Sequence, residues 1–318
     1  MSKIPYGRQS ISETDIEAVV KVLKSDWLTQ GPTIAAFEKA VAEYCGAPHA
    51  VAVSNGTVAL HLAALALGMG PGRRLWTTPM TFVATANAAL YTGGAVDFVD
   101  IDPTTRNLCP QKLKEKLERA AKDKMLPHVV APVHYSGLAC QMKEIKALAD
   151  QYGFALMEDA CHALGGKDSD HKVGASHQSD ATVFSFHPVK SITSAEGGMI
   201  LTRSETIRDK LRLLRTHGIT RNPEQFENEE TGAWYCEQQV LGFNGRMCDL
   251  QAALGLSQLG RLDEFVGLRR ERTKRYYKLL EGLPLTLPPY SDDSAWHLFV
   301  IEVAAPRRRA TVDSLRDA

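Results

Sequence analysis

The chain has 318 residues, 44% of them hydrophobic, so it can bury the cores of one large and one smaller domain. Its 37 basic and 37 acidic side chains balance, so no charge excess favours nucleic acid or an acidic membrane as a partner. No apolar run approaches the ~18 residues of a membrane span, and the N-terminus lacks the apolar core of a signal peptide. Six scattered cysteines without a CxxC pair are typical of reduced thiols, so we expect a cytoplasmic protein with no metal site.

Apolar residues at helical spacing predict helices over residues 12–24 and 33–44, before a long series of alternating strands and helices. The predicted strands are Ala50–Val53, Leu75–Thr78, Ala95–Val99, His128–Pro132, Phe154–Glu158, Ala181–Phe186 and Met199–Thr202. Helices are predicted between them over residues 58–67, 82–91, 110–122 and 142–152. This alternation favours an α/β fold with a mainly parallel seven-stranded sheet covered on both faces.

Beyond the sheet, the polar stretch Thr220–Gln238 predicts a long loop. Further elements are predicted in chain order: helix Asp249–Gly267, helix Leu268–Leu280, strand Trp296–Val303 and a terminal helix from Thr311. We place a large domain at residues 1–245. Residues 246–318 then hold linking helices and a smaller C-terminal α/β domain. This second domain has few partners for its strand, so it is expected to be incomplete.

Lys190 is the most informative residue of the sequence. It follows the strand Ala181–Phe186 and a polar Ser/Thr/Gly segment leads from it into the strand Met199–Thr202. A lysine on a loop between two core strands can be desolvated and aimed at a carbonyl, as Schiff-base chemistry requires. The alternative is an ordinary solvated loop lysine.

Two upstream features make the lysine more specific. The apolar run that ends in Glu158 and Asp159 places Asp159 at a strand carboxyl end, where it can meet a cationic ring nitrogen or simply cap a helix. Gly56 and Thr57 follow a short strand and open a helix, and the helix N-terminus favours a phosphate. A phosphate cradle, a strand-end Asp and a loop Lys, in this order, are the anchors of pyridoxal 5′-phosphate in its commonest aminotransferase fold.

From about Ile4 to its end the chain resembles the DegT/DnrJ/EryC1/StrS family of sugar-nucleotide aminotransferases. The motifs that carry the resemblance are Leu28–Pro32, Ser54–Thr57, Thr81–Asn87, Glu158–Ala160, Phe184–His187, Lys190, Glu196–Gly198 and Asn244–Met247. The resemblance implies the aspartate aminotransferase-like fold type I. Residues 4–11 and 24–31 are most similar to the C4 transaminases of pseudaminic acid biosynthesis. Asn55 stands where many relatives have Ser, and Gln141 where they often have Asp.

The resemblance also implies roles for further residues. Ser185 would join Gly56 and Thr57 on the phosphate, and Phe82 would stack on the pyridine ring. His162 would contact the ring oxygen of the cofactor, and Asn244 would reach the phosphate of the neighbouring subunit in a homodimer with shared active sites. The nucleotide-sugar pocket would involve Tyr6, His187, Glu196 and Arg246. Each of these residues also has a purely structural alternative. Ser185 could pair a strand end, Phe82 and His162 could be core residues, and Asn244 could stand in a left-handed turn.

The implied reaction moves an amino group from glutamate to the C4 ketone of a UDP-linked 4-keto-6-deoxy sugar. Another sugar-nucleotide aminotransferase, acting at C3 or on a dTDP or GDP sugar, is the first alternative. A sugar dehydratase is disfavoured because such relatives replace the lysine with histidine, and a non-catalytic relative is the third possibility. The related transaminases continue past residue 318 with more strands, so we expect this chain to be a C-terminally shortened fragment, or a partner to supply the rest.

Overall fold

Seven short apolar segments form one sheet in the computed structural model, which describes residues 7–228 and 232–317. The strands are β1 (His49–Val53), β2 (Arg74–Thr77), β3 (Ala95–Phe98), β4 (Val129–Val130), β5 (Ala155–Asp159), β8 (Ala181–Ser185) and β9 (Gly198–Thr202). Their order is β1-β9-β8-β5-β4-β2-β3. Only β9 runs antiparallel to its neighbours in this sheet, so the predicted mainly parallel α/β sheet is confirmed.

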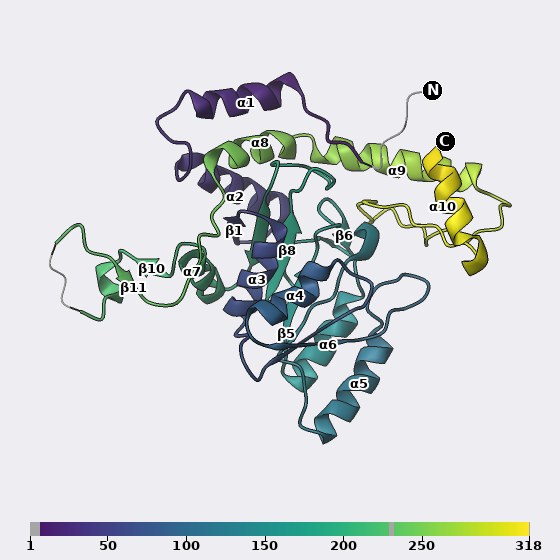
Figure 1. The fold of residues 1–318 in the computed structure, drawn as a ribbon, viewed down its shortest axis with the longest axis horizontal. Helices are drawn as coiled ribbons and strands as arrows, with labels where there is room; N and C mark the ends of the chain where they lie inside the picture. Colours follow the sequence, from purple (N-terminus) through teal and green to yellow (C-terminus); the bar gives the residue numbers. More distant parts are fainter. Residues whose placement is uncertain (1–6, 229–231, 318) are drawn as a thin grey trace.

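Helices cover both faces of the sheet (Figure 1), so its strands are mostly buried except for the largely exposed edge strand β3. One face packs against α3 (Gly56–Ala66), α4 (Val83–Tyr91) and α7 (Glu205–Leu214). The other packs against α2 (Pro32–Cys45), α5 (Pro110–Lys122), α6 (Met142–Tyr152) and α8 (Asp249–Leu259). Helix α1 (Glu13–Leu23) lies on α8.

Neighbouring residues of β5 point to opposite faces, and this alternation positions the candidate site. Met157 belongs to the core shared with α3 and α4, whereas Leu156 belongs to the core under α5 and α6. Continuing the alternation, Glu158 points to the α5/α6 face and Asp159 to the α3/α4 face. The two carboxylates at the end of β5 therefore lie on opposite faces of the sheet and have different neighbours.

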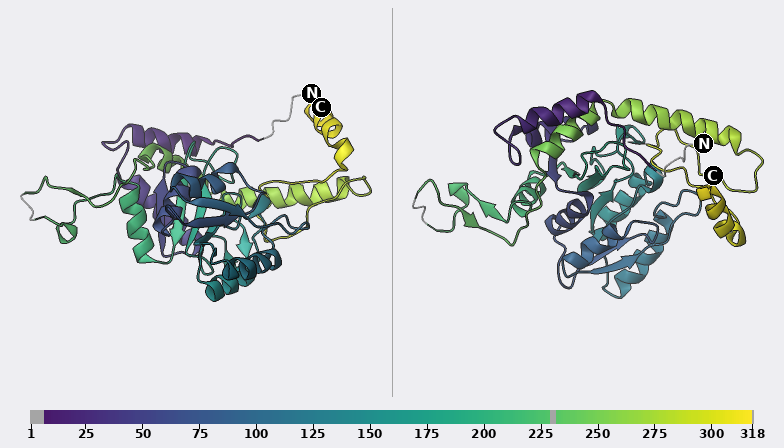
Figure 2. Two further views of the ribbon diagram at one scale, coloured as in Figure 1. Left: turned by 60° about the horizontal axis from the view of Figure 1, so that its bottom comes forward. Right: turned by 45° about the horizontal axis from the view of Figure 1, so that its top comes forward.

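The long polar loop after α7 is paired at its base. Strands β10 (Ile219–Thr220) and β11 (Glu237–Gln238) form a two-stranded antiparallel ladder, which the sequence prediction missed because its strands are so short. Figures 1 and 2 show this arm projecting from one end of the molecule, with the C-terminal elements at the other. None of the helices in the described ranges combines the length and the apolar character needed to cross a membrane.

Two predictions for the C-terminal part are wrong. The helix break lies at Gly260 and Arg261 and not at Gly267, since α9 (Leu262–Leu279) begins where Leu262 and Val266 enter the core of the large domain. Residues 296–303 form no strand: their ladder is reduced to one bridge between Thr286 and Glu302, because the backbone of the segment bonds instead to the turn at residues 136–137. The terminal helix, α10, spans Arg308–Asp317.

Candidate active site

Asp159 ends β5 and is held by two donors from different elements. Its Oδ2 accepts a hydrogen bond from Thr85 Oγ1 of α4 at 2.6 Å, and its Oδ1 accepts one from the Cys161 amide at 3.2 Å. The carboxylate is 5% exposed. A buried carboxylate tied to a neighbouring helix is more than a local cap, and its fixed orientation suits an ion pair with a ligand cation. Thr85 lies within the motif Thr81–Asn87, but it was not predicted as a site residue because its contact with Asp159 joins two distant segments.

Lys190 lies on the loop that leads from β8 to β9 over the same edge of the sheet. The loop is closed at its base by a hydrogen bond from the Phe186 amide to the Gly197 carbonyl, 2.8 Å long, and the Lys190 amide donates to the His187 carbonyl at 2.9 Å. The Lys190 side chain is partly buried. His187 and Glu196, the predicted substrate residues of this loop, are exposed on either side of it.

His162 brings Lys190 and Asp159 into one electrostatic neighbourhood. Burial and the positive charge of Lys190 outweigh the negative charge of Asp159, and together these effects lower the pKa of His162 to about 4. The His162 Nδ1 atom is buried and has no hydrogen-bond partner among the described residues. A buried, unpaired ring nitrogen is costly unless water or a ligand satisfies it, so His162 stays a candidate for a contact with the cofactor beside the alternative of a core histidine.

The N-terminus of α3 forms a cradle together with the end of β8. A Cβ atom on Gly56 would lie 2.9 Å from the Ser185 Cβ, so only glycine allows this approach. Asn55 caps the helix by accepting a hydrogen bond from the Val58 amide at 2.9 Å, which gives a structural role to the residue that differs from the family pattern. Gly56, Thr57 and the Ser185 hydroxyl together can hold a phosphate.

The remaining predicted residues lie around this centre. Phe82 precedes α4 and is 71% exposed, so its ring is available to a ligand and is not part of the core. Asn244 is exposed, and Gly245 beside it accepts a hydrogen bond from the Ser54 amide at 2.9 Å, which fixes this segment against the cradle. Arg246 instead lines a cavity of about 180 Å³ beside α2. Tyr6 lies outside the described residues.

The comparison with known proteins identifies this arrangement. The model of the DegT/DnrJ/EryC1/StrS aminotransferase family matches residues 9–318. The chain belongs to that family. The Bacillus subtilis (strain 168) spore coat polysaccharide biosynthesis protein SpsC is 38% identical over 99% of this chain and 80% of its own.

Solved structures of DegT/DnrJ/EryC1/StrS-type aminotransferases share the fold. PseC of Helicobacter pylori, an aminotransferase involved in the biosynthesis of pseudoaminic acid, has a TM-score of 0.88 and 28% identity over 99% of this chain and 82% of its own. The aminotransferase TlmJ of Streptoalloteichus hindustanus has a TM-score of 0.89 and 28% identity over 99% of this chain and 83% of its own. These matches confirm the fold type I assignment.

Pyridoxal 5′-phosphate is the cofactor of the DegT/DnrJ/EryC1/StrS aminotransferases, and the residues present fit it. The absence of a side chain at Gly56 allows a close approach of backbone to Ser185, Asp159 offers a fixed carboxylate, and the unpaired His162 Nδ1 offers a polar contact. Lys190 would supply the amine. When bound, the cofactor provides the electron sink that stabilises a carbanion next to nitrogen.

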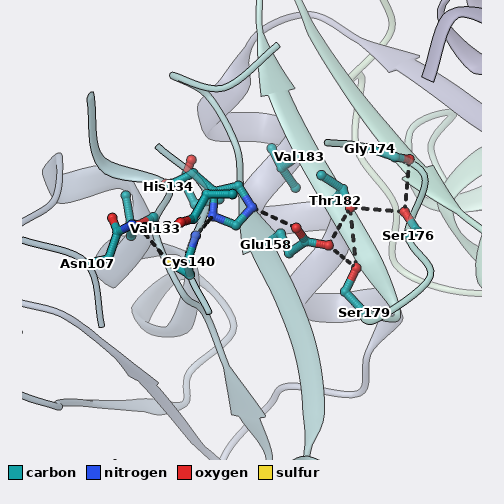
Figure 3. A network of polar contacts seen from close by, with 12 residues as sticks. Asn107, Val133, His134, Cys140, Glu158, Gly174, Ser176, Ser179, Thr182 and Val183 are labelled. Atoms are coloured by element: carbon teal, nitrogen blue, oxygen red, sulfur yellow. Dashed lines mark hydrogen bonds and ion pairs between the residues drawn. The ribbon is translucent and has the colours of Figure 1, made fainter. Parts of the chain in front are cut away.

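Behind Asp159 this aminotransferase carries a buried polar network that sequence analysis missed (Figure 3). Glu158 accepts hydrogen bonds from His134 Nε2 at 2.7 Å, from Thr182 at 3.0 Å and from Ser179. Burial raises the pKa of Glu158, but these donors outweigh it and hold the pKa below its ordinary value. The Cys140 amide donates to His134 Nδ1 at 3.1 Å, so the neutral tautomer with its proton on Nε2 satisfies every contact of the ring.

Removing His134 is expected to destabilise the fold without touching the ligand side of the sheet. His134→Phe leaves the Glu158 carboxylate buried without one donor and the Cys140 amide without an acceptor, which costs about 3 kcal/mol of unfolding free energy. Urea denaturation measures the loss. The exposed His177, changed to Phe, is the control and should stay within about 0.5 kcal/mol. Equal midpoints for the two variants would contradict the structural role of the network.

Proposed function

We propose that this aminotransferase moves an amino group from L-glutamate to the C4 ketone of a UDP-linked 4-keto-6-deoxy sugar of the pseudaminic acid type. The observation that carries the proposal is the convergence of Lys190, Asp159 and His162 beside the Gly56–Ser185 cradle. Two relatives support a sugar substrate, since PseC is involved in the biosynthesis of pseudoaminic acid and SpsC is a polysaccharide biosynthesis protein.

The residues of the chain divide the work of the proposed reaction. The Lys190 amine would hold the cofactor and, when free, would carry the proton that moves between the two carbons of the reaction. Asp159 keeps a proton on the ring nitrogen, because its carboxylate is fixed by Thr85 and the Cys161 amide. Phe82, exposed at the start of α4, covers the ring, and the cradle holds the phosphate.

The deciding experiment presents the purified protein with glutamate and UDP-, dTDP- or GDP-linked 4-keto sugars and follows the products by mass spectrometry. We expect conversion of ketone to amine with the UDP sugar, with the new nitrogen at C4 by NMR. Amination of only a dTDP or GDP sugar, or at C3, would replace the proposed substrate by that sugar. Loss of water without gain of nitrogen would identify a dehydratase, and loss of neither would identify a non-catalytic relative.

We further propose that the active form is a homodimer in which Asn244 completes the phosphate site of the partner subunit. Large apolar side chains that precede Asn244 in the sequence are exposed, with Trp234 and Leu241 each 80% exposed and Phe243 37% exposed. Exposed large apolar side chains are candidates for an interaction surface. Tyr6, His187, Glu196 and Arg246 are proposed to contribute to the nucleotide-sugar pocket of the assembled dimer.

Mixing two inactive variants tests whether the sites are shared. Lys190→Ala and Asn244→Ala, mixed in equal amounts and allowed to exchange subunits, should recover roughly a quarter of wild-type activity, because each mixed dimer holds one intact site. The matched control mixes Lys190→Ala with Asp159→Ala, whose defects lie in the same chain's site, and should recover none. No recovery in the first mixture, with exchange demonstrated, would show that Asn244 serves its own subunit.

A further inference from the structure

The segment after α9 folds back toward the large domain (Figure 1), and its backbone docks on the short turn Tyr135–Gly137. The Ala295 amide donates to the Gly137 carbonyl at 3.0 Å, and the Leu298 amide donates to the Ser136 carbonyl at 3.3 Å. A Cβ atom on Gly137 would lie 2.9 Å from both the His162 carbonyl oxygen and the Trp296 nitrogen. Three distant segments therefore meet at one glycine, with no room for a side chain.

The docked segment adopts an uncommon backbone conformation that its surroundings enforce. Trp296 has a φ angle of 49°, in the left-handed region that bulky residues avoid. Its indole Nε1 donates to the Ser291 carbonyl at 2.9 Å, and Arg269 of α9 donates to the carbonyls of Trp296 and His297 at 3.3 and 3.2 Å. Backbone strain that the surrounding contacts maintain is common at functional sites, so the side chain that follows Trp296 is a candidate for a functional role.

The side chain that this conformation presents is His297, a residue that the sequence analysis did not select. Its ring packs on that of His162, with centroids 4.3 Å apart and planes at 35°. The Nδ1 atoms of both rings are buried without a hydrogen-bond partner among the described residues. His297 thus covers His162, whose ring lies near Lys190 and Asp159.

The charges around the two rings disfavour a proton on either. Burial, together with the positive charges of His162, Lys190 and Arg269, lowers the pKa of His297 to about 2. The His162 ring lies near the rings of Tyr135, at 6.3 Å, and His297, and the positive charge of Lys190 on it is opposed by the negative charge of Asp159. Two buried imidazoles in contact cannot both be cationic next to a lysine.

We propose that His297 is a positioning residue of the active site, which shields the His162 ring from water and thereby keeps it neutral beside Lys190. The role of a neutral His162 in amino transfer rests on the proposed function, which this inference extends to the C-terminal segment. A neutral His162 can exchange a hydrogen bond with the cofactor, whereas a protonated one would place a second cation beside Lys190 and compete for the charge of Asp159. The C-terminal segment is by this inference part of the site that the large domain builds.

The test is a histidine-resolved NMR titration of the cofactor-loaded protein between about pH 5.5 and 8. In the wild type the His162 ring should not titrate in this window. In His297→Ala its pKa should rise by about two pH units, into this window, because water reaches the ring. In His297→Phe, which restores the cover, it should stay low. His177→Ala is the matched control: His177 stacks on His171 with centroids 4.2 Å apart, but both are exposed.

A pH profile gives a second readout. The acid limb of kcat/KM in His297→Ala should move up with the pKa of His162, while activity at about pH 8 stays within a few-fold of wild type. Should His297→Ala fail to fold, His297→Gln carries the same expectation. A His162 pKa that stays low in a folded Ala or Gln variant overturns the inference. The NMR readout needs no turnover, so it remains decisive even if the proposed substrate is wrong.

Discussion

Lys190→Ala is expected to abolish amino transfer, with turnover falling by at least about 10⁴-fold, because no other amine takes its place. The residues that surround Lys190 are histidines with lowered pKa values and a carboxylate, and neither kind can form the same bond to the cofactor. The visible absorbance that reports the lysine-bound cofactor should disappear together with the activity.

Two controls make this result specific. Lys210→Ala, at an exposed position of α7, should leave absorbance and turnover unchanged. A small primary amine added to Lys190→Ala should restore part of the proton transfer, since the cradle and Asp159 remain in place. Turnover by Lys190→Ala at a wild-type rate without added amine would remove the central assignment.

Much of the fold was predictable because the sheet is buried on both sides. Mainly apolar segments such as Ala50–Val53 and Met199–Leu201 stand out from the helices, and helices α5 and α6 were predicted with their observed bounds. The position of β9 between β1 and β8, and its antiparallel direction, are not written in any local segment. They follow from pairing between residues far apart in the chain.

The residues of the candidate site differ in the same way: some belong to short local motifs, and others depend on contacts between distant segments. Lys190, Asp159 and Gly56 were identified from short motifs, because their chemistry depends on their neighbours in sequence. Thr85 and His297 were missed, because each acquires its role only by contact with a distant segment. The strand predicted at residues 296–303 failed for the same reason: its apolar pattern reflects the burial of Trp296 against the turn at residues 136–137 and not the pairing of strands.

Asp159→Asn is expected to lower turnover by about 10³-fold while cofactor affinity falls far less. The amide is nearly isosteric, but it cannot hold a proton on the ring nitrogen by charge, so the ring loses its capacity to accept electrons. The phosphate cradle at Gly56 and Ser185 does not touch Asp159 and should still bind. Single-turnover kinetics with glutamate measure the chemical step, and titration with pyridoxal phosphate measures binding.

A graded comparison separates charge from position. Thr85→Val removes the 2.6 Å donor to Asp159 Oδ2 but leaves the carboxylate charged, so it should lower the rate by about 10-fold, well short of the loss in Asp159→Asn. Asp159→Ala removes both charge and contacts and should match or exceed that loss. If Asp159→Asn instead turns over at close to the wild-type rate with cofactor bound, the carboxylate only joins β5 to α4, and the ring nitrogen needs another partner.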